Sequence, residues 1–318
     1  MRIQFICTQD IKKPFHFCYH YELENHDLQK SVMSQGIINP IWVIQKNGYQ
    51  IIDGHRRWQA AKIAKISRIP VSIFSEKDLF KTFLSALHLN LINGKLSTIE
   101  QCKVIHLTRR FFTPDTYQQI SEILEISRIP DVNEVTTRAM LLPLWIQRYF
   151  HQMDFSLKVI NRIIHYSLTS YLPWLKMAAA LKLNGFELMQ LMENVQDISL
   201  QNKIKVNETF QLLKIEKILQ REMTVQQKIR HLKTVIAEKR WPLLHRSNAH
   251  IQAVINSFPD FFREIAQISW DKTLEQSVIT ISLPAKSVED VKQAIMILSK
   301  IEIQNKLQEL FDQFKKLR

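Results

Sequence analysis

The spacing of hydrophobic positions changes near residue 80. Before this point, short β-favouring runs separated by turn residues predict strands at Ile3–Ile11, Ile41–Ile44, Tyr49–Ile52 and Ile69–Phe74. After it, apolar residues recur at helical spacing for most of the chain. The pattern therefore predicts an α+β fold in which a small mixed domain precedes mainly helical regions.

Local turn signals sharpen the first part. Asn47-Gly48 is the typical two-residue connection of a β-hairpin, so strands 41–44 and 49–52 should pair. Residues 28–35 predict a short helix with Asp27 at its N-cap and Gly36 just past its end. The run Asp53-Gly54 closes the second hairpin strand, and a helical pattern begins at once and continues to Lys65.

The helical part begins with a helix at Asp78–Leu91 and a capping box, Ser97-x-x-Glu100, that opens the next. Two short helices, Tyr117–Leu124 and Val132–Leu142, are then joined by a tight turn around 127–130, which is the length pattern of a helix-turn-helix. The alternative is two ordinary helices of a bundle. Further helices are predicted at Phe155–Tyr166, Trp174–Leu183 and Gly185–Met192.

The last third holds a long basic helical pattern and a small mixed end. Lys203–Glu238 is amphipathic and interrupted near Met223-Thr224, and its charge fits either a solvated face or contact with a DNA backbone. Val278–Ile281 is β-like, and Ser287-x-x-Asp290 caps a final helical stretch. We therefore expect four regions: 1–80, 81–170, 171–246 and 247–318, the last a candidate dimerisation unit.

Charge points to a polyanionic partner. The 318 residues carry 43 Lys+Arg against 30 Asp+Glu, a net charge of +13. The surplus is concentrated in residues 1–98, with 13 basic and seven acidic side chains, and in 203–246, with 11 and four. Such a balance favours nucleic acid as a partner, although it says nothing about fold.

Cysteine usage and hydropathy bound the location. Three cysteines with no paired spacing favour a reducing compartment. The N-terminus lacks the pattern of a signal peptide, and no run of 18 apolar residues occurs. We therefore expect a soluble, cytoplasmic protein.

The strand–turn–helix at 49–65 is the strongest candidate site. A helix that opens directly after a glycine presents unpaired backbone N–H groups and the positive end of its dipole. Arg56 and Arg57 add forked donors suited to phosphate. The pattern indicates an anion cradle; the alternative is a plain turn whose arginines are solvated.

A second candidate lies in Phe15–Tyr21. On a strand, His16, Cys18 and His20 would share one face and could form a metal trio. The alternative is a strand with an aromatic core face and a polar outer face. Because zinc sites usually show clearer ligand spacing, we assign no metal ligands.

With these residues identified, the chain resembles the ParB-like partition proteins over roughly residues 5–170. The first box of that family is similar to Leu28-x-x-Ser31-Val32-x-x-x-Gly36-Ile37-Ile38-Asn39-Pro40-Ile41, and its phosphate box to Gly54-His55-Arg56-Arg57-Trp58-x-Ala60-Ala61. Residues 90–100 stand where the third box falls, and 117–143 resemble the central helix-turn-helix.

The resemblance implies a set of site residues and a ligand. The expected ligand is a nucleoside triphosphate, CTP in this family, held by Gly36, Asn39, Pro40, Gly54, His55, Arg56, Arg57 and Asn90. The candidate DNA contacts of the helix-turn-helix are Arg128, Asn133, Thr136, Thr137 and Arg138.

Two positions depart from the family pattern. His55 and Leu89 stand where the family carries Glu, and neither replaces a carboxylate as a ligand for Mg²⁺. The sequence therefore does not support the family's Mg²⁺ site or its CTP hydrolysis.

The predicted function is a DNA-binding, ParB-like protein in plasmid or chromosome partition or related DNA regulation, with the cradle as a nucleotide switch. Its expected partners are double-stranded DNA, a partition ATPase and a second copy of the chain, with no membrane. The alternative is a nucleotide-dependent enzyme such as a small-molecule kinase. A related free-serine kinase has a turn similar to Asp53-Gly54-His55-Arg56, so Asp53 or His55 would transfer the proton.

Overall fold

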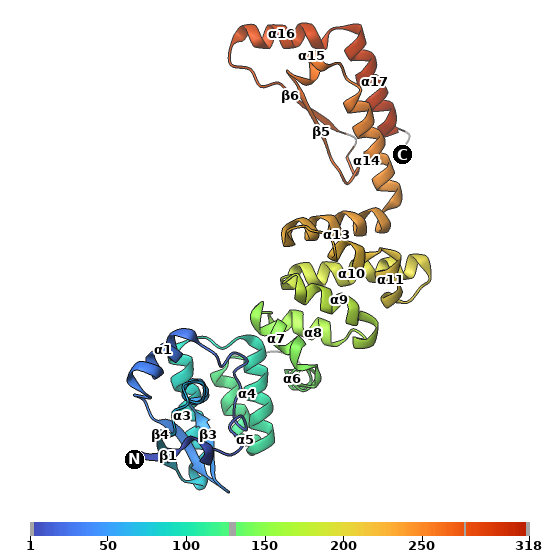
Figure 1. The fold of residues 1–318 in the computed structure, drawn as a ribbon. Coiled ribbons are helices and arrows are strands. Elements are labelled where there is room, and N and C mark those ends of the chain that lie inside the picture. Colours follow the sequence, from blue (N-terminus) through green and yellow to red (C-terminus); the bar gives the residue numbers. More distant parts are fainter. Residues whose placement is uncertain (1–2, 127–131, 277, 316–318) are drawn as a thin grey trace. The chain divides into compact units, whose positions relative to one another are not determined.

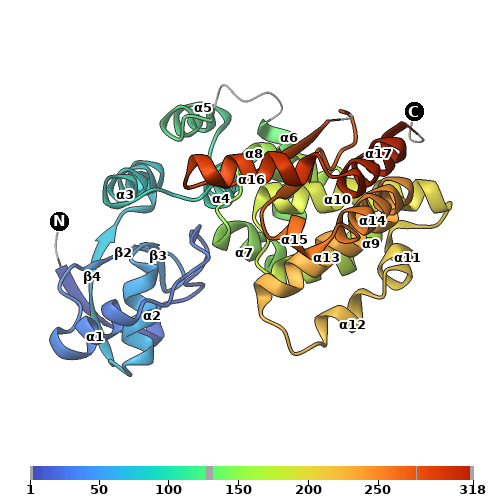
Figure 2. The same cartoon turned by 90° about the horizontal axis from the view of Figure 1, so that it is seen from above.

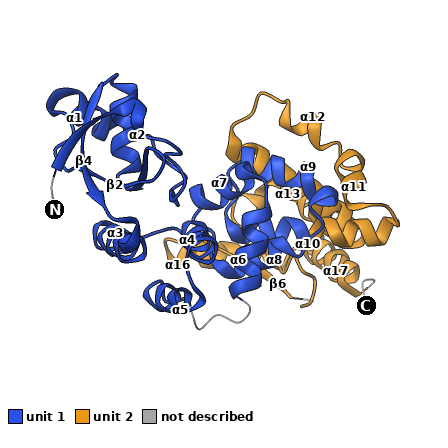
Figure 3. Cartoon of the chain, turned by 90° about the horizontal axis from the view of Figure 1, so that it is seen from below, with its two compact units in different colours: residues 1–192 blue, residues 193–318 orange. Residues whose placement is uncertain are grey.

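In the computed structural model, residues 3–126, 132–276 and 278–315 are described. The chain forms two compact units, residues 1–192 and residues 193–318, and the boundary falls within one helix, α10 (Gly185–Asn202) (Figure 3). The first unit holds a mixed sheet with helices followed by helices alone, so the α+β prediction is confirmed. No helix in the described ranges has the length and apolar character needed to cross a bilayer.

The first unit begins with a four-stranded sheet in the order β1-β4-β2-β3 (Figure 1). Its elements are β1 (Ile3–Cys7), α1 (His26–Gln35), β2 (Ile41–Gln45), β3 (Tyr49–Asp53), α2 (His55–Ile63) and β4 (Arg68–Phe74). β2 pairs antiparallel with β3 through the predicted Asn47-Gly48 turn, and parallel with β4, which pairs antiparallel with β1. The hairpin prediction is confirmed.

The sheet is covered on both faces, which explains its nearly continuous apolar strands. Ile51 faces α1 and α2, which lie side by side (Figure 2), whereas its neighbour Ile52 faces the core shared with α3 and α4. This alternation follows from the two-residue period of a strand. The α2 side is anchored by Trp58, and the opposite side by Phe83.

Helices complete the first unit. They are α3 (Leu79–Asn93), α4 (Thr98–Phe111), α5 (Pro114–Ile123), α6 (Val132–Leu141), α7 (Leu144–Gln152), α8 (Leu157–Ile164) and α9 (Leu168–Ala180). The capping box of Ser97 and Glu100 opens α4 as predicted. Both α5 and α6 contact α4, and α6 also contacts α8. The two helices of the predicted helix-turn-helix are present, while their predicted turn at 127–130 lies outside the described residues.

The second unit contains helices and one small sheet. Beyond α10, its elements are α11 (Val206–Leu212), α12 (Ile215–Leu219), α13 (Val225–Arg240), α14 (Pro242–Asn256), α15 (Asp260–Arg263), β5 (Gln267–Trp270), β6 (Ile279–Ser282), α16 (Val288–Leu298) and α17 (Ile301–Lys315). β5 and β6 pair antiparallel, and α14 packs on α17 around buried Phe258 and Leu310. The Ser287–Asp290 capping box opens α16 as predicted.

Three sequence expectations were wrong. The N-cap of α1 is Asn25 and not Asp27, because the Asn25 side chain accepts a hydrogen bond from the backbone N–H of Leu28 and the helix begins at His26. Phe15–Tyr21 is not a strand but a run of turns and irregular backbone, because its aromatic rings pack into the core beside Phe83 and Phe111. Lys203–Glu238 is not one helix with a single break but three helices. The additional break falls at Lys214, whose φ of 52° is left-handed.

Lysine recurs at left-handed positions where helices end. Lys65, Lys182, Lys203 and Lys214 have φ between 52° and 55° and follow α2, α9, α10 and α11. Glycine normally takes such positions because it has no Cβ to clash with the carbonyl oxygen. With only five glycines in the chain, lysine serves instead.

The irregular segment 15–24 is fixed to α7 by a buried hydrogen bond. Tyr21 donates from its hydroxyl to Oε1 of Gln147 at 2.6 Å, and Gln147 in turn donates to the Leu142 carbonyl at 2.7 Å. Tyr21→Phe would leave the amide oxygen buried without this donor, which should cost about 1–2 kcal/mol in the free energy of unfolding. Urea denaturation measures the loss. In a Gln147→Leu background the same change should cost much less, and an equal cost would contradict the pairing.

Candidate phosphate site and nucleic-acid surface

The candidate cradle is built where β3 ends and α2 begins. Gly54 has a φ of 93° and forms the N-cap of α2 directly after Asp53, so the chain turns within one residue. A Cβ on Gly54 would lie 3.0 Å from Nη2 of Arg57, so both backbone and space require glycine. The first N–H groups of α2 lack intrahelical acceptors by helix geometry, and together with the dipole they favour an anion.

Arg57 joins three separate parts of the domain. Its Nη2 donates to Oδ2 of Asp53 at 2.6 Å, and its Nη1 donates to the carbonyls of Asn39 at 2.7 Å and Pro40 at 3.1 Å. Asn90 on α3 donates from Nδ2 to Oδ1 of Asp53 at 3.0 Å. The structure thus brings together five residues that the sequence singled out. Their polar groups bond to one another, and this clamp holds the turn at Gly54 in place: Asn39, Pro40, Asp53, Arg57 and Asn90.

Arg56 has a different role from its neighbour. Its side chain is exposed, and among the residues that the structure describes its one hydrogen bond is from Nε to the carbonyl of Glu22, at 3.0 Å. The terminal nitrogens of Arg56 therefore remain available to a ligand. Gly36, the remaining residue of the predicted set, has a φ of 73° and ends α1.

His55 is enclosed at the first position of α2. Its side chain is 4% exposed, and its Nε2 is buried with no hydrogen-bond partner among the described residues. Burial, with the nearby charges of His20, Lys103 and Arg57, lowers the pKa of His55 to about 3. The imidazole is neutral near pH 7, and its enclosed Nε2 is not accessible for proton transfer.

A buried polar cluster beside the cradle was not foreseen. Glu100 receives hydrogen bonds from Ser97, and its Oε1 lies 3.1 Å from Nδ1 of His20. Oε2 lies 3.7 Å from Nδ1 of His151. Although burial by itself raises the pKa of Glu100, the hydrogen bond and charge of His20 outweigh it, and the pKa is lowered. The sequence predicted that Glu100 takes part in capping α4. It did not predict the contacts of Glu100 with His20 and His151, which lie 80 and 51 residues away along the chain.

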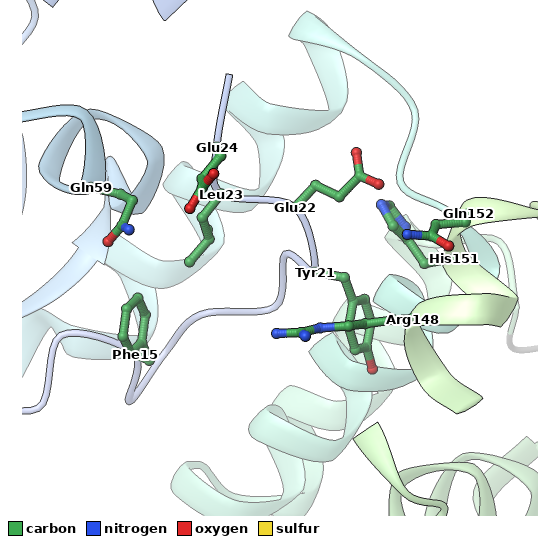
Figure 4. A pocket seen from close by; sticks show the side chains of 9 residues that line it. All are labelled: Phe15, Tyr21, Glu22, Leu23, Glu24, Gln59, Arg148, His151 and Gln152. Atoms are coloured by element: carbon green, nitrogen blue, oxygen red, sulfur yellow. The ribbon is translucent and has the colours of Figure 1, made fainter. Parts of the chain in front are cut away.

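This cluster borders a cavity of about 460 Å³ (Figure 4). It is lined by side chains of segment 15–24, α2 and α7: Phe15, Tyr21, Glu22, Leu23, Glu24, Gln59, Arg148, His151 and Gln152. Arg148 and the carboxylates of Glu22 and Glu24 give it mixed charge. None of these residues was proposed from the sequence.

His16, Cys18 and His20, which the sequence offered only as a possible metal trio, do not come together as ligands. The ring of His16 packs on Phe111 at 4.4 Å between centroids, the Cys18 thiol donates to the His20 carbonyl, and His20 pairs with Glu100. Across the described ranges, no group of three or more His, Cys, Asp or Glu side chains is arranged to hold a metal ion.

The candidate DNA-binding helix α6 exposes one clear face. Asn133, Thr137 and Arg138 are exposed, and Arg109 of α4 joins them by donating from Nη1 to Oγ1 of Thr137 at 3.0 Å. Arg138 pairs with exposed Glu134 on the same helix. Thr136, in contrast, is 1% exposed and donates to the Asn133 carbonyl, so its side chain faces the interior. Arg128 lies outside the described residues.

Comparison with known proteins identifies the family of the first domain. Residues 8–87 match the model of the ParB N-terminal domain. A probable chromosome-partitioning protein ParB from Vibrio cholerae is 33% identical over 109 residues, which cover 34% of this chain and 36% of that protein. A namesake from Neisseria meningitidis serogroup A is 24% identical over 208 residues, covering 64% and 69%.

A solved structure gives a weaker likeness. The C-terminally truncated ParB of Caulobacter crescentus, complexed with CTP-gamma-S, is 22% identical, with 52% of this chain and 94% of that one covered and a TM-score of 0.26. At that score we take no site from the superposition. The chain spans about a third of the length of its Vibrio relative, so the family assignment rests on the first domain. Residues 8–87 therefore belong to the ParB N-terminal domain family, and the relatives that match this part of the chain are named chromosome-partitioning protein ParB.

Proposed function

We propose that this protein binds double-stranded DNA in plasmid or chromosome partition or related DNA regulation, and that a nucleotide held at the start of α2 acts as its switch. The observation that carries the proposal is the order of parts in one unit: a ParB N-terminal domain with a braced cradle, followed directly by α5 and α6 with an exposed polar face.

The nucleotide part rests on the cradle. The N-terminus of α2, the Gly54 turn and the available guanidinium of Arg56 present donors to one anion, and a triphosphate is the anion that this arrangement suits. CTP is the nucleotide that the family resemblance implies. Asp53 is engaged at both oxygens and Nε2 of His55 is enclosed, so we propose binding rather than catalysis at this site.

The DNA part rests on α6. Its exposed Asn133, Thr137 and Arg138 are side-chain types that contact base edges and phosphates in the major groove. Arg109 lies beside them and suits a phosphate contact. We leave Thr136 out of the proposed set because its hydroxyl is buried and already bonded.

A second basic surface lies within residues 193–318. A cavity of about 430 Å³ between α12 and α13 is lined by Lys214, Lys217, Arg221 and Lys239. In the described ranges none of these four forms a salt bridge. Four cations with a single lining carboxylate, Glu238, suit a sequence-independent contact with a DNA backbone.

The same unit exposes an apolar surface on α16. Val288, Val291, Ile295 and Met296 are between 46% and 71% exposed. Contiguous apolar surface of this kind marks an interaction site, and a helix-turn-helix protein that reads an inverted repeat acts as a dimer. We therefore propose that a second copy of the chain covers α16.

Loss of Arg138 should separate specific from general DNA binding. We expect Arg138→Ala to weaken binding to a duplex enriched by binding-site selection by about 10- to 100-fold, because one side chain at a base edge contributes roughly 1–3 kcal/mol of discrimination. Binding to unrelated duplex should change little. Fluorescence anisotropy at several salt concentrations measures both.

The control for this test removes the same charge elsewhere. Arg68→Ala, on β4, should leave the preference for the selected duplex intact. An Arg138→Ala effect no larger than that of Arg68→Ala would overturn the assignment of α6. Selection that enriches no sequence, with weak binding even at low salt, would overturn DNA binding itself.

A further inference from the structure

The family's nucleotide is accompanied by Mg²⁺, so the carboxylates around the start of α2 decide whether a metal fits here. Mg²⁺ requires oxygen ligands in near-octahedral geometry, and beside a nucleotide it takes one or two protein carboxylates together with the phosphates and water. Asp53 lies closest in sequence to the cradle, and its two oxygens accept from Arg57 and Asn90. Releasing it for a metal would dismantle the clamp.

Glu100 is equally committed. One oxygen faces His20, and the other accepts from both the backbone N–H and the hydroxyl of Ser97. Its side chain is 4% exposed. Turning it toward a ligand would uncap α4 and leave His20 without its carboxylate.

His55 and Leu89, which stand where the family carries Glu, cannot supply oxygen ligands in place of Asp53 and Glu100. Nε2 of His55 is enclosed by protein, and Leu89 offers only hydrocarbon. Glu22 and Glu24 remain as exposed carboxylates, but they lie on the irregular segment that lines the cavity, and across the described ranges neither belongs to a group of three metal-ligating side chains. The residues present do not fit a Mg²⁺ ion.

Side-chain cations are available in place of the metal. Arg56 keeps its terminal nitrogens free, and Nζ of Lys103 lies 4.6 Å from the centre of the Tyr21 ring. Neither forms a salt bridge with a carboxylate in the described part of the chain. Both lie near enough to Cys18 to lower its pKa, which burial raises, so they flank one short segment beside α2.

We infer that the cradle binds its nucleotide without a divalent cation, and that Arg56 and Lys103 supply the positive charge that Mg²⁺ supplies elsewhere. This inference rests on the proposed nucleotide binding. A polyphosphate at the start of α2 would meet the helix dipole and two cations already held in place, and a partly buried cation gains more from an anion than a solvated one. Without a bound metal to stabilise the leaving phosphate, the nucleotide would persist as a ligand.

Isothermal titration of the full chain with CTP, in EDTA and again in millimolar MgCl₂, tests the inference. We expect the same dissociation constant in both buffers. Lys103→Met and Arg56→Gln should each weaken binding about tenfold or more, because each removes a charge-assisted contact. Lys62→Gln removes one charge from the last turn of α2 and should leave binding unchanged. A free energy of unfolding in urea close to that of the wild type shows that each variant is folded.

The opposing outcomes are distinct. Affinity that rises tenfold or more on adding Mg²⁺ would overturn the inference while leaving nucleotide binding in place, and loss of that gain in Glu22→Gln would identify the ligand. Unchanged binding in both Lys103→Met and Arg56→Gln would also overturn it. Absence of CTP binding in either buffer would overturn the nucleotide part of the proposed function as well.

Discussion

Acidification from pH 7 to pH 4.5 should cost the folded protein about 2–3 kcal/mol through His55 alone. The pKa of His55 falls from its ordinary 6.5 to about 3 in the folded chain, chiefly through burial. Below pH 6.5 the unfolded chain binds a proton that the folded chain does not. Stability present above pH 6.5 is therefore lost progressively as pH falls toward 3.

His55→Leu tests this directly. The substitution keeps a buried side chain of similar size and removes both the titration and the unpaired Nε2. Urea unfolding can be followed by tryptophan fluorescence, since buried Trp58 lies on the same helix. Between pH 6.5 and 4.5 the free energy of unfolding of the variant should fall less steeply than that of the wild type, by the slope that corresponds to one bound proton. Above pH 7.5 the two profiles should run parallel. Identical slopes throughout the acid range would contradict the burial of a neutral imidazole.

Arg57→Ala should lower the free energy of unfolding by about 2–4 kcal/mol, because hydrogen bonds to charged groups contribute roughly 1.5–3 kcal/mol each. Arg57 links the Asn39-Pro40 loop to Asp53, and its side chain is 22% exposed. Arg57→Lys should recover little of the loss, since an ammonium cannot reproduce the fork.

The adjacent arginine provides a matched control. Arg56→Ala removes the same side chain one position earlier, where a single contact to the Glu22 carbonyl is made at the surface. Its unfolding free energy in urea should therefore remain close to that of the wild type, while its nucleotide affinity falls. Equal destabilisation by the two substitutions would mean that Arg57 does not brace the domain.

Local chemistry made much of the fold predictable. Asn47-Gly48 specified the hairpin, Gly36 ended α1, Gly54 turned β3 into α2, and Ser97 with Glu100 opened α4. In each case neighbours along the chain determine the conformation. The segment 15–21 failed because its alternation came from rings that enter the helical core, a tertiary preference that looks the same as a strand in sequence.

The sequence singled out several residues that the structure brings together, but it did not predict their arrangement. The sequence placed Arg56 and Arg57 together as phosphate donors, yet only Arg56 is free, since Arg57 turns back over Gly54 to reach Asp53. Which of two adjacent arginines turns inward depends on the Asn39-Pro40 loop and α3. The His20–Glu100 pair depends likewise on residues far apart in the chain.

The four lysines in the left-handed conformation are positions at which a substitution can increase the stability of the fold. A non-glycine residue in that conformation costs roughly 1–2 kcal/mol, so Lys65, Lys182, Lys203 and Lys214 each hold stability that glycine would release. A lineage that acquires a damaging core substitution can compensate at Lys65, Lys182 or Lys203 without altering either proposed binding surface, whereas Lys214 lies in the basic surface between α12 and α13. Each such exchange also removes one positive charge, so this route trades affinity for polyanions against robustness of the fold.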